Sequence, residues 1–208
     1  EASGHGSFTG RLAHYLCEQA AASSAAGEFD KAIAYLLQAV HIAPHAPRPH
    51  MDLARIYTLQ GDAERACLTL TQAMLVAPAA VPLIAPLLAQ AAIASDQVTR
   101  VLELLKANYT QNPCLDVIDA IVVLEAASGA PTATAREWYA RHLASEPSLV
   151  AAAKWISGEK LGHEQFHPQV QRALDHAVKP LTRYRCAACG FEAKQHFWQC
   201  PGCQTWDS

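Results

Sequence analysis

The sequence feature that most constrains the fold is an internal repeat with a period of 34 residues in the first half of the chain. When the sequence is shifted by 34 positions, the following identical residues fall on one another: Ala20/Ala54, Gly27/Gly61, Ala32/Ala66, Leu36/Leu70, Ala39/Ala73, Ala43/Ala77 and Pro44/Pro78. Such a period is typical of proteins in which each unit buries its apolar face only against its neighbours. We therefore expect a stack of similar units.

The repeated positions have physical reasons. Gly27 and Gly61 are predicted to end the first helix of each unit, where a left-handed residue is needed. Ala32 is small because two helix backbones approach closely there, and Pro44 and Pro78 stop the second helix. A helix–turn–helix unit of 34 residues resembles the tetratricopeptide repeat (TPR) family. That resemblance implies a right-handed superhelix whose concave face holds a peptide or helix of another protein. The alternative is a scaffold that only positions another part.

One position departs from the TPR pattern. The large aromatic residue that such repeats carry early in the first helix is absent, and Leu16 and His50 stand there. His50 could line a groove, but exposure on a helix surface is the commoner situation for a histidine. We interpret His50 as a surface residue.

After Pro78 the repeat weakens, but helical patterns continue. They predict helices over 81–93, 97–110, 115–128, 133–145, 148–157 and 168–179. Pro82 is tolerable in a first turn, whereas Pro86 suggests a kink or a later start of its helix. Alanine makes up 41 of the 208 residues and aromatic residues only 7%, which favours close-packed helices. The predicted fold is therefore mainly all-α.

Three domains follow from these patterns. We predict a flexible end over 1–10, a TPR-type helical-hairpin solenoid of about five helix pairs over 11–180, and a small module over 181–208. Pro180 ends the helical region. Cys17, Cys67 and Cys114 are scattered through helical segments and are interpreted as small buried residues.

The last segment, TRYRCAACGFEAKQHFWQCPGCQTWDS, carries the strongest chemical signal. Two thiolates three positions apart on a tight turn face one metal ion, and two such turns close a tetrahedral site. Gly190 and Gly202 are expected where these turns need an unhindered backbone. His196 lies between the turns and is predicted not to be a ligand, because four cysteines complete the tetrahedron. The predicted ligands of one metal ion per chain are Cys186, Cys189, Cys200 and Cys203.

The module is too small to fold without the metal, and it is rich in aromatic residues. We predict that its aromatics pack against the last helices, whose apolar residues include Trp155, Phe166, Val170, Leu174 and Val178. Stacking on nucleic-acid bases is the rival use of these aromatics. Nucleic acid is not expected as a partner, because the net charge is −3 and the charge near the module is modest.

TPR repeats followed by YRCAACGFEAKQHFWQCPGCQTW resemble the lipopolysaccharide assembly protein B family, whose C-terminal metal module is rubredoxin-like. The resemblance is strongest over 184–206. It implies a non-enzymatic adaptor at the cytoplasmic face of the bacterial inner membrane, which promotes degradation of the deacetylase LpxC by the protease FtsH. This chain contains no apolar run long enough to span a membrane. We therefore expect it to be the soluble C-terminal part of a membrane-anchored protein.

Two departures from true rubredoxins leave the metal open between iron and zinc. The two cysteine turns lie closer together in the sequence, and Gln204 stands where a glycine often follows the second turn. The alternative function is an iron-based redox module on a TPR scaffold.

An enzyme is not expected, although one string formally matches the H-E-x-x-H pattern of zinc proteases. It consists of His163, Glu164, two further residues and His167. Pro168 follows at once and disfavours a helix at His167, so we interpret the match as accidental.

Overall fold

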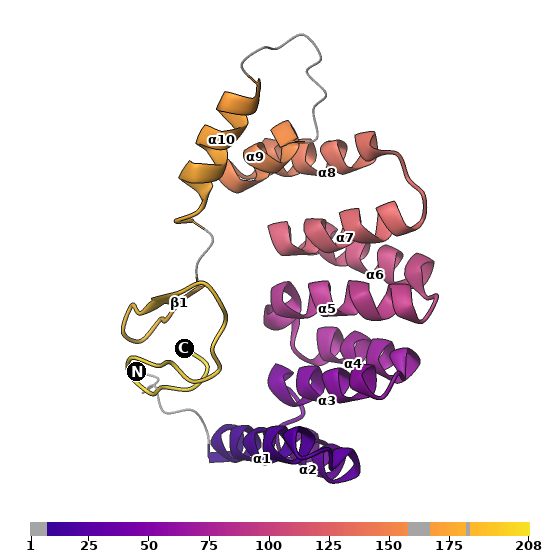
Figure 1. Cartoon of the computed structure of the whole chain (residues 1–208), viewed down its shortest axis with the longest axis vertical. Coiled ribbons are helices and arrows are strands. Elements are labelled where there is room, and N and C mark those ends of the chain that lie inside the picture. Colours follow the sequence, from indigo (N-terminus) through magenta and orange to yellow (C-terminus); the bar gives the residue numbers. More distant parts are fainter. Residues whose placement is uncertain (1–7, 158–166, 182–183) are drawn as a thin grey trace. The chain divides into compact units, whose positions relative to one another are not determined.

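The computed structural model describes residues 8–157, 167–181 and 184–208. Two compact units divide between Asn108 and Tyr109, and each is described on its own. The first contains α1 (Phe8–Ala25), α2 (Phe29–Ile42), α3 (Pro47–Leu59), α4 (Ala63–Val76), the short 3-10 turn η1 (Pro78–Ala80) and α5 (Val81–Ala94) (Figure 1). Helix α6 (Val98–Gln111) runs from the first unit into the second. The second continues with α7 (Leu115–Ala127), α8 (Thr132–Ser145), α9 (Leu149–Ser157), α10 (His167–Val178), β1 (Tyr184–Arg185) and β2 (Glu192–Ala193).

The first unit is a stack of antiparallel helix pairs, as the repeat predicts. Helix α1 packs on α2 and α3 on α4, while α2 contacts α3 and α4 contacts α5 (Figure 1). Leu36 and Leu70, which are equivalent in the two repeats, are almost fully buried. Ala32 and Ala39 are also fully buried. Because alanine adds only a methyl group, the helices approach closely at these positions. The predicted TPR-type solenoid is confirmed.

The turns within the helix pairs share one conformation. Gly61 has a φ of +79°, its N–H donates to the carbonyl of Thr58 at 3.0 Å, and the next N–H donates to Tyr57 at 2.8 Å. This pair of hydrogen bonds is a Schellman motif, which satisfies carbonyls at the end of a helix. The same motif closes α5 with an aspartate, because Asp96 has a φ of 55°. The left-handed turn therefore also forms at a position where the glycine is replaced by aspartate.

Polar contacts join the helices of the second unit. Trp138 Nε1 on α8 donates to Oε2 of the buried Glu125 on α7 at 3.0 Å. Asp119 on α7 accepts a hydrogen bond from the hydroxyl of Tyr139 at 2.8 Å and pairs with Lys154 of α9. Helices α7 to α10 contact one another in sequence order. A buried carboxylate needs such donors, because leaving it unpaired is costly.

Several predictions need correction. His50 is buried, and its Nε2 lies 3.1 Å from the carbonyl oxygen of Pro44, so its interpretation as a surface residue is wrong. Helix α5 begins at Val81 and continues through Pro86, so the later start is also wrong. Cys17 and Cys67 are buried as predicted, whereas Cys114 is only half-buried and precedes α7 as its N-cap.

The remaining observed boundaries lie closer to the predicted ones. Helix α1 begins at Phe8, inside the range predicted as a flexible end. Of the H-E-x-x-H string, His163 and Glu164 lie outside the described residues, and His167 opens α10. The domain boundary after residue 180 stays a prediction. In the described ranges no single helix is long and apolar enough to cross a membrane. Helix α4 and the Pro78–Ala94 segment reach that length and composition only together, across a bend of 119°.

Candidate functional site

The first cysteine turn is built by backbone hydrogen bonds. The N–H of Cys186 donates to the carbonyl of Phe191, and the N–H of Gly190 donates to the carbonyl of Cys186, both at 2.9 Å. Gly190 has a φ of +78°, which L side chains rarely adopt. Strands β1 and β2 pair antiparallel on either side of this turn. The need for glycine after the first turn is therefore confirmed.

The second turn repeats this arrangement without a glycine at the matching position. The N–H of Cys200 donates to Thr205 and the N–H of Gln204 donates to Cys200, again at 2.9 Å. Gln204 takes a φ of 61° and so supplies in this turn the left-handed conformation that Gly190 supplies in the first. Gly202 has no left-handed φ, and an added Cβ there lies 3.4 Å from Cβ of Phe191, in ordinary contact. The left-handed residue of the second turn is therefore Gln204, and the expectation of an unhindered backbone at Gly202 stays a prediction.

The two turns bring the four predicted ligand sulfurs together. All four Sγ atoms lie within 4.8 Å of one another. The Sγ atoms of Cys186 and Cys203 are 3.8 Å apart, and those of Cys189 and Cys200 are 3.6 Å apart. A tetrahedral ion with bonds of about 2.3 Å requires sulfurs about 3.8 Å apart, whereas a disulfide requires about 2.05 Å. All four are free thiols, and each close pair joins one turn to the other. This spacing fits one shared ion better than two redox disulfides.

The pKa values of the clustered thiols also favour the binding of a cation. The hydroxyl of Ser208, followed by the amide of Cys189, lowers the pKa of Cys186 to about 6. The amide of Phe191 lowers the pKa of Cys189, but burial and hydrogen bonds from the neighbouring thiols outweigh it and raise that pKa to about 12. Four thiolates this close repel one another, so they do not all ionise without a compensating charge. A bound metal cation supplies that charge.

His196 is not part of the sulfur cluster. Its ring lies edge-on between Tyr184, at 5.6 Å between ring centroids, and Trp198, at 4.5 Å. The metal-binding group found in the described residues consists of the four cysteines alone. Tyr184, Phe191 and Phe197 remain between 38% and 44% exposed. The module therefore keeps apolar surface that it does not bury within itself.

A second candidate site is an apolar groove in the first unit. It has a volume of about 550 Å³ and lies between α3 and α5, with two further lining residues from α4. Its lining residues are Met51, Ala54, Arg55, Thr58, Leu59, Ala63, Leu70, Leu87, Gln90, Ala91 and Ala94. Leu59, one of these lining residues, is 68% exposed. The groove is large enough to take apolar side chains of a partner.

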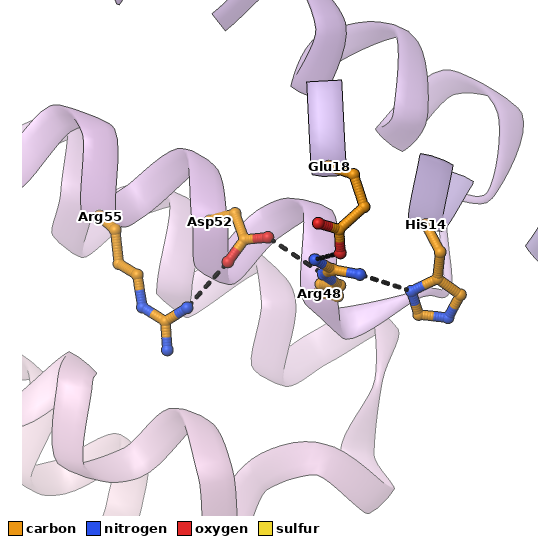
Figure 2. A network of polar contacts seen from close by, with 5 residues as sticks. All are labelled: His14, Glu18, Arg48, Asp52 and Arg55. Carbon is orange, nitrogen blue, oxygen red and sulfur yellow. Dashed lines mark hydrogen bonds and ion pairs between the residues drawn. The ribbon is translucent and has the colours of Figure 1, made fainter. Parts of the chain in front are cut away.

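A polar network that was not predicted from the sequence borders this groove. Figure 2 shows Arg48 of α3 between Glu18 and His14 of α1 and Asp52 of its own helix. Its guanidinium lies 2.5 Å from Glu18 Oε1, 3.3 Å from His14 Nδ1 and 3.3 Å from Asp52 Oδ2. Asp52 also pairs with Arg55, a groove residue, at 2.8 Å. Burial raises the pKa of Asp52, although the two arginines partly oppose this.

The repeat itself contains the signal for this network. His14 and Arg48 are 34 residues apart, and so are the acidic Glu18 and Asp52. Equivalent residues of successive units lie side by side when the units stack. Polar residues at equivalent repeat positions are therefore candidates for contacts between units.

The helix pairs and the sulfur cluster define a class of protein: a TPR-type helical repeat protein with a four-cysteine metal-binding module at its C-terminal end. The tetratricopeptide repeat family model matches residues 24–91. A zinc-ribbon family model, described as a rubredoxin metal binding domain, matches residues 184–208.

The chain is similar to lipopolysaccharide assembly protein B of Escherichia coli strain K12. The two are 22% identical over 222 residues, covering 95% of this chain and 52% of the relative. The protein of the same name from Escherichia coli O157:H7 gives the same values. The resemblance drawn from the sequence is thereby confirmed. The chain spans about half the length of the curated relatives it matches.

Solved structures support the fold alone. A putative kinesin light chain with TPR-like repeats from Podosopora anserina has a TM-score of 0.51 at 19% identity, covering 85% of this chain and 99% of that one. An ArsTM double mutant of the MamA protein from RS-1 has a TM-score of 0.50 at 11% identity, covering 81% and 97%.

Proposed function

We propose that this chain is the protein-binding and metal-binding part of a non-enzymatic adaptor in lipopolysaccharide assembly. The observation that carries the proposal is the pairing of TPR repeats with a four-cysteine module, together with similarity to lipopolysaccharide assembly protein B over 95% of the chain. The partners are the protease FtsH and the deacetylase LpxC, at the cytoplasmic face of the inner membrane. By bringing the two together, the adaptor promotes degradation of LpxC.

The groove between α3 and α5 is the proposed partner-binding site. Its lining is mostly apolar, and burial of apolar surface is the dominant favourable term in most protein associations. Leu59, whose side chain is exposed, lines the groove from α3, and Leu87 lines it from α5. An apolar helical segment of a partner covers both residues.

The metal is proposed to stabilise the module. Cys186, Cys189, Cys200 and Cys203 hold one iron or zinc ion, and their spacing fits a tetrahedral site for either. In a segment this short, metal binding supplies most of the folding free energy. The ion thus keeps the module folded.

A pair of leucine variants tests the binding site. Leu59→Arg places a charge in the groove, whereas Leu75→Arg places the same charge on α4 at a residue that is 65% exposed and does not line the groove. We expect Leu59→Arg to reduce co-purification of FtsH and LpxC at least tenfold and to lengthen the cellular half-life of LpxC. Leu75→Arg should behave as wild type. Equal effects of the two variants, or none from Leu59→Arg, would contradict the proposal.

A further inference from the structure

The last four residues of the chain fold back over the cysteine turns. Trp206 forms an isolated β-bridge with Gln199, and the N–H of Asp207 donates to the carbonyl of Trp198 at 3.0 Å. Asp207 has a φ of 52°, which is uncommon for a residue other than glycine. Backbone bonds therefore maintain a strained turn, and this turn delivers Ser208 to the sulfur cluster. Such strain persists where the surrounding structure over-determines it.

Two hydroxyl groups contact two of the four sulfurs. Ser208 Oγ lies 3.1 Å from Cys186 Sγ, and Thr205 Oγ1 lies 3.3 Å from Cys203 Sγ. Ser208 Oγ also lies 3.4 Å from the carbonyl oxygen of Thr205, which is the longer of its two contacts. In the described residues, no hydroxyl is placed in this way beside Cys189 or Cys200.

Metal binding dictates the direction of both hydrogen bonds. A cysteine that binds a metal is a thiolate, which has no proton and can only accept. The hydroxyls of Ser208 and Thr205 must then donate to Cys186 and Cys203. Four thiolates around a divalent ion carry a net charge of about −2, and hydrogen bonds to an ionised acceptor are about twice as strong as neutral ones.

We propose that Ser208 and Thr205 are positioning residues that donate hydrogen bonds to two of the metal-bound thiolates and thereby retain the metal. This inference rests on the proposed metal site of four cysteines. The hydroxyls act through the sulfurs and do not touch the ion. Because hydroxyl donors spread the charge of the thiolates, their removal leaves more charge on sulfur and a site that loses its metal more readily.

The test uses the full chain with Zn²⁺ or Co²⁺ and isosteric substitutions. Ser208→Ala and Thr205→Val remove one hydroxyl each, while Ser208→Thr and Thr205→Ser keep it. Thr69→Val is the matched control, because the Thr69 hydroxyl bonds only its own helix, at Arg65. Competition with a chromogenic chelator gives the metal affinity. The sulfur-to-cobalt charge-transfer bands report the electron density on the thiolates.

Each hydroxyl deletion should lower the metal affinity by about 10–100-fold and move the charge-transfer bands to longer wavelength. Ser208→Thr, Thr205→Ser and Thr69→Val should match wild type in both measurements. If wild type binds metal and the deletions leave affinity within twofold and the bands in place, this inference is wrong and the metal site stands. If Ser208→Thr and Thr205→Ser lose metal as severely as the deletions, the hydroxyls are not responsible and the inference is also overturned. A wild-type protein that binds neither metal overturns the metal site and the inference together.

Discussion

Gly61 and Asp96 end α3 and α5 in the same left-handed conformation, but only glycine adopts it without strain. Their φ angles are 79° and 55°. A left-handed conformation costs an L-residue about 1–2 kcal/mol, and aspartate bears it better than most residues. Nothing lies within 4 Å of a Cβ built on Gly61, so the choice of residue there depends on the backbone and not on packing.

Two substitutions in these turns should have opposite effects. Gly61→Ala should destabilise the fold by about 1 kcal/mol, because the new side chain strains the backbone without a clash. Asp96→Gly should stabilise it by about 0.5 kcal/mol, because relief of strain exceeds the added freedom of the unfolded chain. Urea unfolding followed by circular dichroism measures both changes. A Gly61→Ala protein as stable as wild type would show that the left-handed turn is not maintained in solution.

At the level of whole elements, the polar network is the main charged contact between α1 and α3. Arg48 is buried, with its side chain only 9% exposed, while the side chains of Asp52 and Glu18 are 20% and 54% exposed. Breaking a buried pair by removing one partner costs about 3–5 kcal/mol, whereas replacing both with apolar residues is often neutral. The network therefore favours one alignment of the helices more than it adds net stability.

A double-mutant cycle tests this view of the network. Arg48→Met should destabilise the protein by about 3 kcal/mol at pH 7, because the half-buried carboxylate of Asp52 then keeps only the exposed Arg55 as its ion-pair partner. The double variant Arg48→Met/Asp52→Leu should recover most of that loss. Thermal unfolding of the single and double variants gives the coupling free energy. Additive losses would mean that the two residues stabilise the fold independently.

On the scale of the whole molecule, the repeats and the metal module are predicted to stabilise each other. The module keeps Tyr184, Phe191 and Phe197 partly exposed, and Val170 on α10 is 48% exposed. Apolar side chains at this exposure gain about 25 cal/mol for each Å² that they bury. The packing of the module against the last helices, predicted from the sequence, remains to be tested.

Metal removal combined with hydrogen exchange gives that test. Chelation should increase exchange in α9 and α10 as well as in the module, because the module then unfolds and uncovers the helices. Peptides from α1 to α4 serve as the internal control and should not change. Unchanged protection of α9 and α10 would mean that the module is an independent domain on a tether.

Exchange of the metal separates the structural role from the redox alternative. We expect zinc-loaded protein to retain FtsH and LpxC binding, because the metal holds the four cysteines together whatever its identity. Iron-loaded protein should bind equally well in both oxidation states. Binding that required iron and followed its oxidation state would support a redox module instead.

The features that could be predicted from the sequence are those fixed by short-range chemistry. The helix pairs follow from the 34-residue period, the turns at Gly27 and Gly61 from the backbone freedom of glycine, and the sulfur cluster from two cysteine turns of short spacing. In each case a short pattern of residues determines the conformation of one turn or helix, and the recurrence of that pattern predicts the larger arrangement. The structure contains the helix pairs, the left-handed glycines and the cluster of sulfurs that these patterns predict.

Other features became visible only in the tertiary structure, because they depend on contacts between segments distant in the sequence. His50 is buried because α3 lies inside the stack, and Arg48 reaches Glu18 and His14 only when α1 lies beside α3. Ser208 reaches Cys186, which lies 22 residues earlier in the chain, because the last residues turn back across the module. The repeat and the cysteine spacing thus determine which elements form. The way these elements pack decides which polar side chains lose water, and those side chains must then find partners across the interfaces.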